Sequence, residues 1–216
     1  MAEAGVIVQA RMNSARVPGK VLRPLAGRPL LGHLLDRLGT LGIPVVVATS
    51  DHPGDNELAS FCEAEGVAMY RGALDDVAAR FVGAARQHGV DPIVRVSGDS
   101  PLLDPALVRR ALGLWKPGVI VTNVRPRTFP TGQSVEAFEL AALEGADVTD
   151  ETREHVTTTL YERLRIENFS HSPDLSHLRL TLDTERDAAR LDALFERMDR
   201  PPSEYALDEL VALCSA

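Results

Sequence analysis

The chain has 216 residues, 44% of them hydrophobic, which is enough for one large α/β domain with a sizeable core. Its formal net charge of -8 argues against non-specific binding to nucleic acid, which needs an excess of cations. Cys62 and Cys214 form no CxxC pattern, and neither a membrane span of roughly 20 apolar residues nor a signal peptide is visible. We therefore expect a cytoplasmic protein without disulfides, structural zinc or membrane contact.

Short β-branched runs alternate with segments of helical period in the first half of the chain. The expected strands lie at about 5–9, 44–48, 67–71, 92–96 and 118–122, and the helices near 30–41, 55–65, 74–88 and 105–114. This alternation predicts a parallel sheet covered by helices on both faces, with ligands at the carboxyl ends of the strands.

The pattern changes after Asn123. Residues 125–132 form a loop rich in turn formers, long enough to act as a lid or as a wall of a ligand site. Beyond it the sequence predicts strands at 134–138, 165–169 and 178–182 and helices at 149–164 and from 184 onwards. We predict one domain over residues 1–216. Within it, residues of about 123–170 form an insertion of loop and strand that would make one wall of the ligand site.

Several short polar residues are placed to begin helices. Thr184 with Asp187 three residues later is a relative of the capping box, and Asp104 precedes a proline at the first helical position. Asp75-Asp76 is placed to cap the helix over 74–88, and we assign the cap to Asp75.

A basic segment follows the first expected strand. Arg11, Arg16 and Lys20 lie within ten residues of one another, together with Gly19. A strand that leads into a glycine-containing basic loop leaves N–H groups and cationic side chains facing one crevice, which suits a polyphosphate. The alternative is three solvated cations, but their clustering directly after a buried strand favours a phosphate-binding loop.

Two aspartates follow expected strands in matched settings. Asp99 comes after the strand at 92–96, with Gly98 allowing a tight turn, and Asp183 comes after the strand at 178–182. Mg²⁺ prefers oxygen ligands, and one or two carboxylates with substrate phosphates make an adequate site. Either aspartate alone is better explained as a cap. Together with a phosphate loop, they predict a magnesium site shared across the crevice.

Polar residues at other strand ends give weaker signals. The second strand ends in Thr49, Ser50 and Asp51. Their short polar side chains could hydrogen-bond to the edge of a nucleobase, and a simple turn into the next helix explains them equally well. Arg71, at the end of the third strand, is assigned to ligand contact. His155 has no second histidine at ligand spacing, so it is a structural histidine or an acceptor contact. No nucleophile elbow, Walker sequence or Ser-His-Asp order is present, so covalent catalysis has no support.

Taken together, these residues resemble the cytidylyltransferases of the spore-coat polysaccharide (SpsF) type, relatives of the CMP-KDO and CMP-acylneuraminate synthetases. The resemblance covers nearly the whole chain. It is carried by Val8-Gln-Ala-Arg-Met12, Arg16-Val-Pro-Gly-Lys-Val-Leu22, Val47-Ala-Thr-Ser-Asp51, Arg71-Gly72, Asp75-Asp-Val77, Arg95-Val-Ser-Gly-Asp-Ser-Pro-Leu102, Phe129-Pro-Thr-Gly132, Val135-Glu136, Glu154-His-Val-Thr157 and Arg179-Leu-Thr-Leu-Asp-Thr184.

The resemblance implies a three-layer α/β/α, Rossmann-like (GT-A-like) nucleotidyltransferase fold with a mostly parallel mixed sheet. It also implies a homodimer that uses Mg²⁺ to transfer CMP from CTP to a sugar acceptor, with release of pyrophosphate. Arg11, Lys20 and Asp99 would be catalytic, and Asp99 and Asp183 would bind the metal. The nucleotide would contact Gln9, Ala10, Arg11, Arg16, Gly19, Lys20, Thr49, Ser50, Asp51, Arg71 and Gly98, and the acceptor would contact Arg95, Thr131, Gly132, Gln133, Glu136 and His155.

Two positions depart from the pattern of these relatives. Ser100 stands where many have cysteine, a change that should spare the chemistry. Gln133 stands where they commonly have leucine, and it replaces an apolar contact with a hydrogen-bonding one at the acceptor side.

The expected reaction is in-line attack by an acceptor oxygen on the α-phosphorus, which needs positioning and charge neutralisation. A negatively charged acceptor would suit four further cations, although surface ion pairs explain them equally well: Arg95, Arg125, Arg127 and Arg179. Two alternatives stay open. One is a sugar-phosphate nucleotidylyltransferase that uses another triphosphate, and the other is a non-catalytic nucleotide-binding subunit of a polysaccharide-assembly complex.

Overall fold

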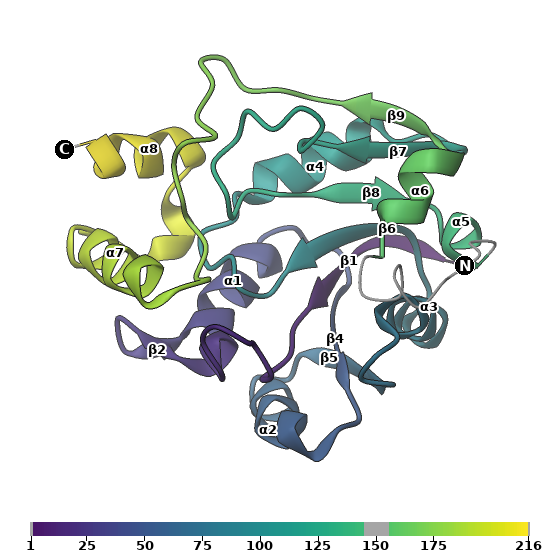
Figure 1. The fold of residues 1–216 in the computed structure, drawn as a ribbon, viewed down its shortest axis with the longest axis horizontal. Helices are drawn as coiled ribbons and strands as arrows, with labels where there is room; N and C mark the ends of the chain where they lie inside the picture. Colours follow the sequence, from purple (N-terminus) through teal and green to yellow (C-terminus); the bar gives the residue numbers. More distant parts are fainter. Residues whose placement is uncertain (1, 145–155, 216) are drawn as a thin grey trace.

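The computed structural model describes residues 2–144 and 156–215, and within them one mixed sheet carries the architecture (Figure 1). The sheet has seven strands in the order β5-β4-β1-β6-β8-β7-β9. All neighbours are parallel except β8, which runs antiparallel to both β6 and β7. The strands are β1 (Glu3–Gln9), β4 (Val45–Ser50), β5 (Ala68–Gly72), β6 (Val90–Ser97), β7 (Val119–Thr122), β8 (Glu136–Phe138) and β9 (Arg165–Asn168). The expected mostly parallel mixed sheet is confirmed.

Helices cover both faces of this sheet, and a small hairpin lies beside it. The α-helices are α1 (Leu30–Gly39), α2 (Asn56–Ala64), α3 (Val77–His88), α4 (Pro105–Leu114), α5 (Leu140–Glu144), α6 (Thr158–Arg163), α7 (Glu185–Glu196) and α8 (Leu207–Ser215). The short elements are the hairpin β2 (Pro24–Leu25) and β3 (Arg28–Pro29), and the 3-10 helices η1 (Lys20–Leu22), η2 (Pro53–Asp55) and η3 (Pro202–Glu204). None of the helices in the described ranges is long and apolar enough to cross a membrane.

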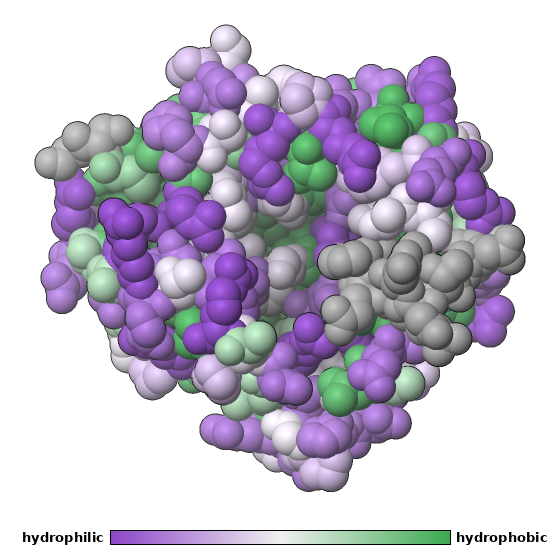
Figure 2. Space-filling view, viewed as in Figure 1, coloured by the Kyte–Doolittle hydropathy of each residue, from purple (hydrophilic) through white to green (hydrophobic). Residues whose placement is uncertain are grey.

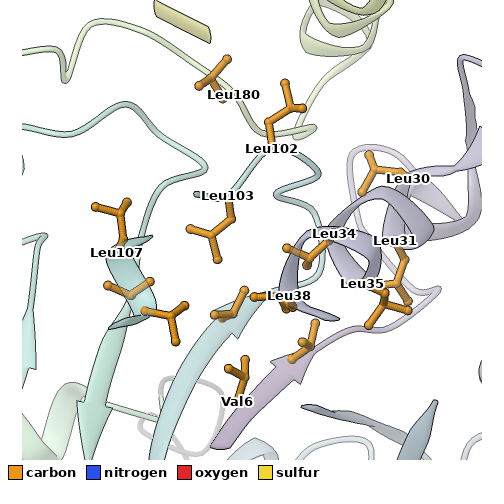
Figure 3. Packing of buried hydrophobic residues seen from close by; sticks show 14 of the residues in the cluster. Val6, Leu30, Leu31, Leu34, Leu35, Leu38, Leu102, Leu103, Leu107 and Leu180 are labelled. Atoms are coloured by element: carbon orange, nitrogen blue, oxygen red, sulfur yellow. The ribbon is translucent and has the colours of Figure 1, made fainter. Parts of the chain in front are cut away.

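The alternation of side chains along the strands produces the three layers. In β1, Val6 and Val8 belong to a buried cluster with residues of α1, α4 and α7, whereas Ile7 belongs to a second cluster with residues of α3. Figure 3 shows leucines of α1 and of the segment 102–107 converging above Val6. Because β1, β4 and β7 are buried on both faces, their residues form mainly apolar runs in the sequence, whereas the edge strands β5 and β9 are partly exposed.

The segment 178–182 differs from its prediction as a strand. It makes a single isolated parallel bridge, Thr131 to Arg179, in which the Leu180 N–H donates to the Thr131 carbonyl at 2.7 Å. It then turns towards β6, where the Leu182 N–H donates to the Asp99 carbonyl at 3.0 Å. The alternating apolar pattern therefore reflects the burial of Leu180 and Leu182 against the core, and no further strand is added to the sheet.

Two of the expected helix caps are confirmed and one is displaced. Thr184 and Asp187 form a full capping box at α7, and the Asp104 side chain accepts from the Ala106 N–H at the start of α4. At α3 the cap is Asp76, whose carboxylate accepts from the Ala79 N–H at 2.8 Å, so the assignment to Asp75 is wrong. Of the expected helix over 149–164, the described part is helical from Thr158 to Arg163.

Candidate functional site

A cavity of about 320 Å³ opens at the carboxyl ends of β1 and β6, beneath the loop of residues 10–19. Figure 2 shows a hollow near the centre of this face of the molecule, with hydrophilic side chains gathered along its rim. The lining includes the sequence-predicted residues Gln9, Ala10, Arg11, Arg16, Lys20, Arg95 and Asp99. The basic loop therefore faces a cavity, as a phosphate-binding loop requires.

The loop reaches the cavity through a left-handed turn at its end. Gly19 has φ of 72°, and its N–H donates to the Met12 carbonyl at 2.8 Å, which closes the loop on itself. Lys20 is the first residue of η1, and it lines the cavity.

The two aspartates converge on one cation. Lys20 Nζ lies 2.6 Å from Asp99 Oδ2 and 3.0 Å from Asp183 Oδ1. Arg16 Nη2 lies 3.4 Å from the same oxygen of Asp183, and its side chain is 67% exposed. In the described part of the chain, no group of three or more His, Cys, Asp or Glu side chains gathers as a metal site, so these carboxylates form a pair.

The backbone of Asp99 itself holds Asp183 in place. The Asp99 carbonyl accepts from the Thr181 hydroxyl at 3.1 Å and from the Leu182 N–H at 3.0 Å. At the start of this turn, Gly98 lies so close to β1 that an added Cβ would stand 2.8 Å from the Cβ of Ala10. Its N–H donates to the Gln9 carbonyl at 2.8 Å. Gly98 thus allows the ends of β1 and β6 to meet.

Arg179 supports Asp183 from the side away from Lys20. Its Nη2 lies 3.1 Å from Asp183 Oδ2, and its Nε lies 3.0 Å from Asp187 Oδ1. Burial would raise the pKa of Asp187, but hydrogen bonds from Arg179 and Thr184 outweigh it and hold that pKa well below its ordinary value. Asp183 and Asp187 therefore neutralise the charge of Arg179. This agrees with the second explanation given for this arginine in the sequence analysis, ion pairing within the protein.

Two of the residues predicted to contact the acceptor, Arg95 and Glu136, belong to a polar cluster beside the cavity. This carboxylate is buried and accepts from Arg95 Nη1 and from the Tyr161 hydroxyl, while Arg95 also donates to Gln9 Oε1 at 3.1 Å. Burial and the neighbouring Glu136 raise the pKa of Tyr161. Arg125 stacks over the Tyr161 ring with 3.8 Å from guanidinium carbon to ring centroid. Tyr161 carries no motif that would identify it from sequence.

Arg127 completes this cluster. Its Nη1 donates to the Ser134 hydroxyl at 2.9 Å, and burial lowers the pKa of its guanidinium despite the opposing charge of Glu136. Arg95 and Arg127 thus share one buried glutamate beside the cavity, and Arg125 stacks on the tyrosine that donates to it.

Gln133 does not face an acceptor. It is fully buried, its Nε2 donates to the Leu102 carbonyl at 2.7 Å, and its Oε1 accepts from the Asp104 N–H at 2.9 Å. The amide replaces leucine because two backbone groups at the entrance to α4 use its hydrogen bonds. The neighbouring Thr131 and Gly132 act through their backbone, in the crossing with segment 178–182. His155 lies outside the described residues.

The residues at the ends of β4 and β5 that were predicted to contact the nucleotide mainly form and stabilise a turn. Arg71 donates from Nε to the Ser50 carbonyl at 3.0 Å and from Nη2 to Asn56 Oδ1 at 2.8 Å, so it braces this turn, and its assignment to ligand contact stays a prediction. The Asp51 N–H donates to the Gly72 carbonyl. Thr49 and Ser50 are fully buried.

Asp55 is a residue that the sequence analysis missed. It is 2% exposed, its Oδ1 accepts from the Met12 N–H at 2.6 Å, and its Oδ2 accepts from the Ser50 hydroxyl. It therefore fastens the basic loop to the end of β4. An aspartate in a turn after a strand is equally typical of a helix cap, so no local signal marks this long-range role.

Comparison with known proteins extends the likeness over the whole chain. A family model described as cytidylyltransferase matches residues 5–209. The spore coat polysaccharide biosynthesis protein SpsF of Bacillus subtilis (strain 168) is 30% identical over 96% of this chain and 92% of its own length. A 3-deoxy-manno-octulosonate cytidylyltransferase of Anaeromyxobacter dehalogenans is 34% identical over 58% of this chain and 53% of its own length.

Solved structures show the same architecture. A cytidylyltransferase of Leptospira borgpetersenii superposes with a TM-score of 0.91 at 29% identity, covering 100% of this chain and 94% of that one. A CMP:2-keto-3-deoxy-manno-octonic acid synthetase in complex with CTP superposes with a TM-score of 0.63 at 17% identity, covering 90% of this chain and 99% of that one, which shows a shared fold.

Proposed function

This chain belongs to the cytidylyltransferase family, and we propose that it transfers CMP from CTP to an anionic sugar with release of pyrophosphate. The observation that carries the proposal is the meeting of Asp99 and Asp183 on Lys20 at the edge of a cavity lined by Arg11 and Arg16. Opposed carboxylates and cations at one strand edge suit a divalent ion together with a polyphosphate.

The paired carboxylates fit Mg²⁺. One oxygen of each lies within 3.0 Å of a single ammonium, so both can reach one cation, and hard oxygen donors are what this ion prefers. Two protein ligands are sufficient where substrate phosphates and waters complete the coordination. When bound, the ion would polarise phosphate oxygens and neutralise charge that develops on them.

The cations of the basic loop would stabilise the departing pyrophosphate. Arg16 is largely exposed at the mouth of the cavity, so it can turn towards a bound triphosphate, and Lys20 carries a flexible point charge beside it. Ser14 and Ala15 of the same loop line the cavity beside these cations. Asp99 and Asp183 would hold the triphosphate in line through the shared ion, so that the protein positions the reactants and does no covalent chemistry.

The arginines around Glu136 indicate an anionic acceptor. Arg95 lines the cavity and pairs with Glu136, and the charge of Arg127 acts on the same carboxylate, so two positive charges share one buried negative charge. A carboxylate or phosphate on the sugar would use the surplus of positive charge. A neutral sugar would leave it unpaired.

A pyrophosphate-release assay tests the whole proposal. Purified protein with Mg²⁺ is incubated with CTP, UTP, GTP or ATP and with a panel of acidic, phosphorylated and neutral sugars. We expect release with CTP and an acidic or phosphorylated sugar. Thermal shifts with each nucleotide give a second measure, since a ligand at 100 times its Kd stabilises by roughly 2.7 kcal/mol. Equal shifts with all four nucleotides, or release with neutral sugars alone, would contradict the assignment.

Replacing Asp55 with alanine is expected to weaken CTP binding. The substitution removes the acceptor of the Met12 N–H, which frees the basic loop from β4 and leaves buried donors unpaired. We expect KM for CTP to rise about tenfold, because a buried charged hydrogen bond is worth roughly 1.5–3 kcal/mol. Asp55→Asn keeps a carbonyl oxygen for Met12 and should recover part of the loss. Unchanged KM in both variants would remove this role of Asp55.

A further inference from the structure

The ammonium of Lys20 occupies the space between the two carboxylates that would hold the divalent ion. It lies 2.6 Å from Asp99 Oδ2 and 3.0 Å from Asp183 Oδ1, distances typical of direct charged hydrogen bonds. The three side chains are only 12%, 18% and 20% exposed, so solvent screens these contacts weakly.

The other oxygen of Asp183 is also occupied. Arg179 Nη2 lies 3.1 Å from Asp183 Oδ2, and Arg179 is itself fixed by Asp187. The carboxylate pair therefore already has its counter-charges from the protein. A divalent ion that bound the same oxygens would meet Lys20 at close range, where like charges repel.

We propose that Lys20 is an internal counter-ion that keeps a divalent ion from the Asp99–Asp183 pair until a triphosphate draws the ammonium away. The proposal rests on the proposed function, since it assumes that the pair binds the ion. Lys20 is suited to this exchange because its stem is flexible and it lines the same cavity as Arg11 and Arg16. A triphosphate in that cavity offers the ammonium new anionic partners while bringing its own oxygens to the ion.

This arrangement has a consequence for binding order. The free protein should bind a divalent ion weakly, and nucleotide should strengthen ion binding by the same factor by which the ion strengthens nucleotide binding. Until then, Lys20 also prevents the two carboxylates from repelling each other, so the site stays assembled.

The test measures Mn²⁺ binding to the protein without nucleotide, by the electron paramagnetic resonance signal of the free ion. Lys20→Met keeps an unbranched side chain of nearly the same length and removes the ammonium group. We expect this variant to bind Mn²⁺ about tenfold more tightly than wild type, because no charged hydrogen bonds have to be broken. Addition of CTP should tighten Mn²⁺ binding by about tenfold in wild type and much less in the variant.

Arg23→Met is the matched control for the change in net charge. Arg23 lies directly after η1 and pairs with the exposed Glu185, whereas Lys20 pairs with Asp99 and Asp183. Its removal takes away one positive charge without freeing either carboxylate, so Mn²⁺ affinity should change by less than about twofold.

Thermal unfolding guards against a variant that fails to fold. Without its counter-ion, Lys20→Met should melt at a lower temperature than wild type, and Mn²⁺ should restore the loss, whereas Mn²⁺ should hardly shift wild type. A variant that folds only with Mn²⁺ would support the proposal in the same way.

Two results would overturn it, and they are distinguishable. Equal Mn²⁺ affinities of wild type and Lys20→Met without nucleotide would remove the counter-ion role, while pyrophosphate release by wild type would leave the proposed function standing. Absence of both Mn²⁺ binding and pyrophosphate release in wild type would remove the proposed function, and this proposal with it.

Discussion

Replacing Asp99 with asparagine is expected to lower the rate of CMP transfer about 10³-fold, the scale of losing one strong electrostatic contact to the reacting phosphates. An amide keeps the size of the side chain but removes the charge that would hold the divalent ion. Asp99 also makes the shorter of the two contacts to Lys20, so the variant misplaces a cation of the phosphate site as well. The measurement is pyrophosphate release under single-turnover conditions with CTP and the best acceptor.

The fold should survive this substitution. Asp99 contributes its backbone carbonyl to segment 181–182, and asparagine keeps that carbonyl. Asparagine can still accept a hydrogen bond from Lys20, and Asp183 keeps its charge beside the ammonium, so the loss of stability should stay within the roughly 1.5–3 kcal/mol of one charged hydrogen bond. Asp192→Asn, the same change at an exposed position of α7, is the control and should leave the rate unchanged.

Asp183→Asn should cause a comparable loss of rate, and the double variant should be little worse than either single one. Two ligands of one ion act as a unit, so their effects do not add. Turnover near that of wild type in Asp99→Asn would defeat the assignment of this residue, and additive losses would show that the two aspartates act separately.

Most of the sheet could be predicted because local signals agree with its topology. The β-branched runs of β1, β4, β6 and β7 are buried on both faces, which makes them continuous in sequence and easy to delimit. Glycine and proline mark the loops at their carboxyl ends. The convergence of Asp99 and Asp183 was predicted on a premise that holds only for Asp99, which follows β6, because Asp183 follows a loop segment that reaches the site through the hydrogen bond from the Leu182 N–H to the Asp99 carbonyl.

The sequence is least informative where long-range hydrogen bonds decide the role of a polar side chain. Gln133, Arg71 and Asp55 are each satisfied by backbone or side-chain groups far away in the sequence, and no local pattern separates such a residue from one that contacts a ligand. Segment 178–182 has the alternation of a strand, yet its partner is a loop, so only tertiary contacts distinguish the two. The homodimer implied by the resemblance stays a prediction.

Gly132 is the position where a small change should do the greatest damage to stability. Its φ of +97° disfavours any residue with a side chain, and a Cβ built there would stand 2.4 Å from the Leu180 carbonyl oxygen and 2.5 Å from its carbon. These are backbone atoms, so no change of side-chain rotamer can relieve the clash. We expect Gly132→Ala to lower the free energy of unfolding by roughly 2–5 kcal/mol, the sum of a backbone cost and an overpacking cost.

Urea unfolding, followed by the fluorescence of the single tryptophan, measures this loss, and Gly66→Ala separates its two causes. Gly66 has φ of +65° with no atom within 4 Å of an added Cβ, so its replacement should cost only about 1 kcal/mol, the price of the backbone conformation. Equal losses in the two variants would show that the crossing of Gly132 and Leu180 is not tight.

The clash at Gly132 should also displace Asp183 in the proposed active site. To relieve it, segment 178–182 must move away from Thr131, which breaks the hydrogen bond from Leu180 and shifts Asp183 relative to Lys20. Gly132→Ala should therefore also lose CMP transfer at temperatures where it is still folded, and Gly66→Ala should keep it. Full activity in folded Gly132→Ala would mean that the segment carrying Asp183 is placed by its contacts with the Asp99 carbonyl alone.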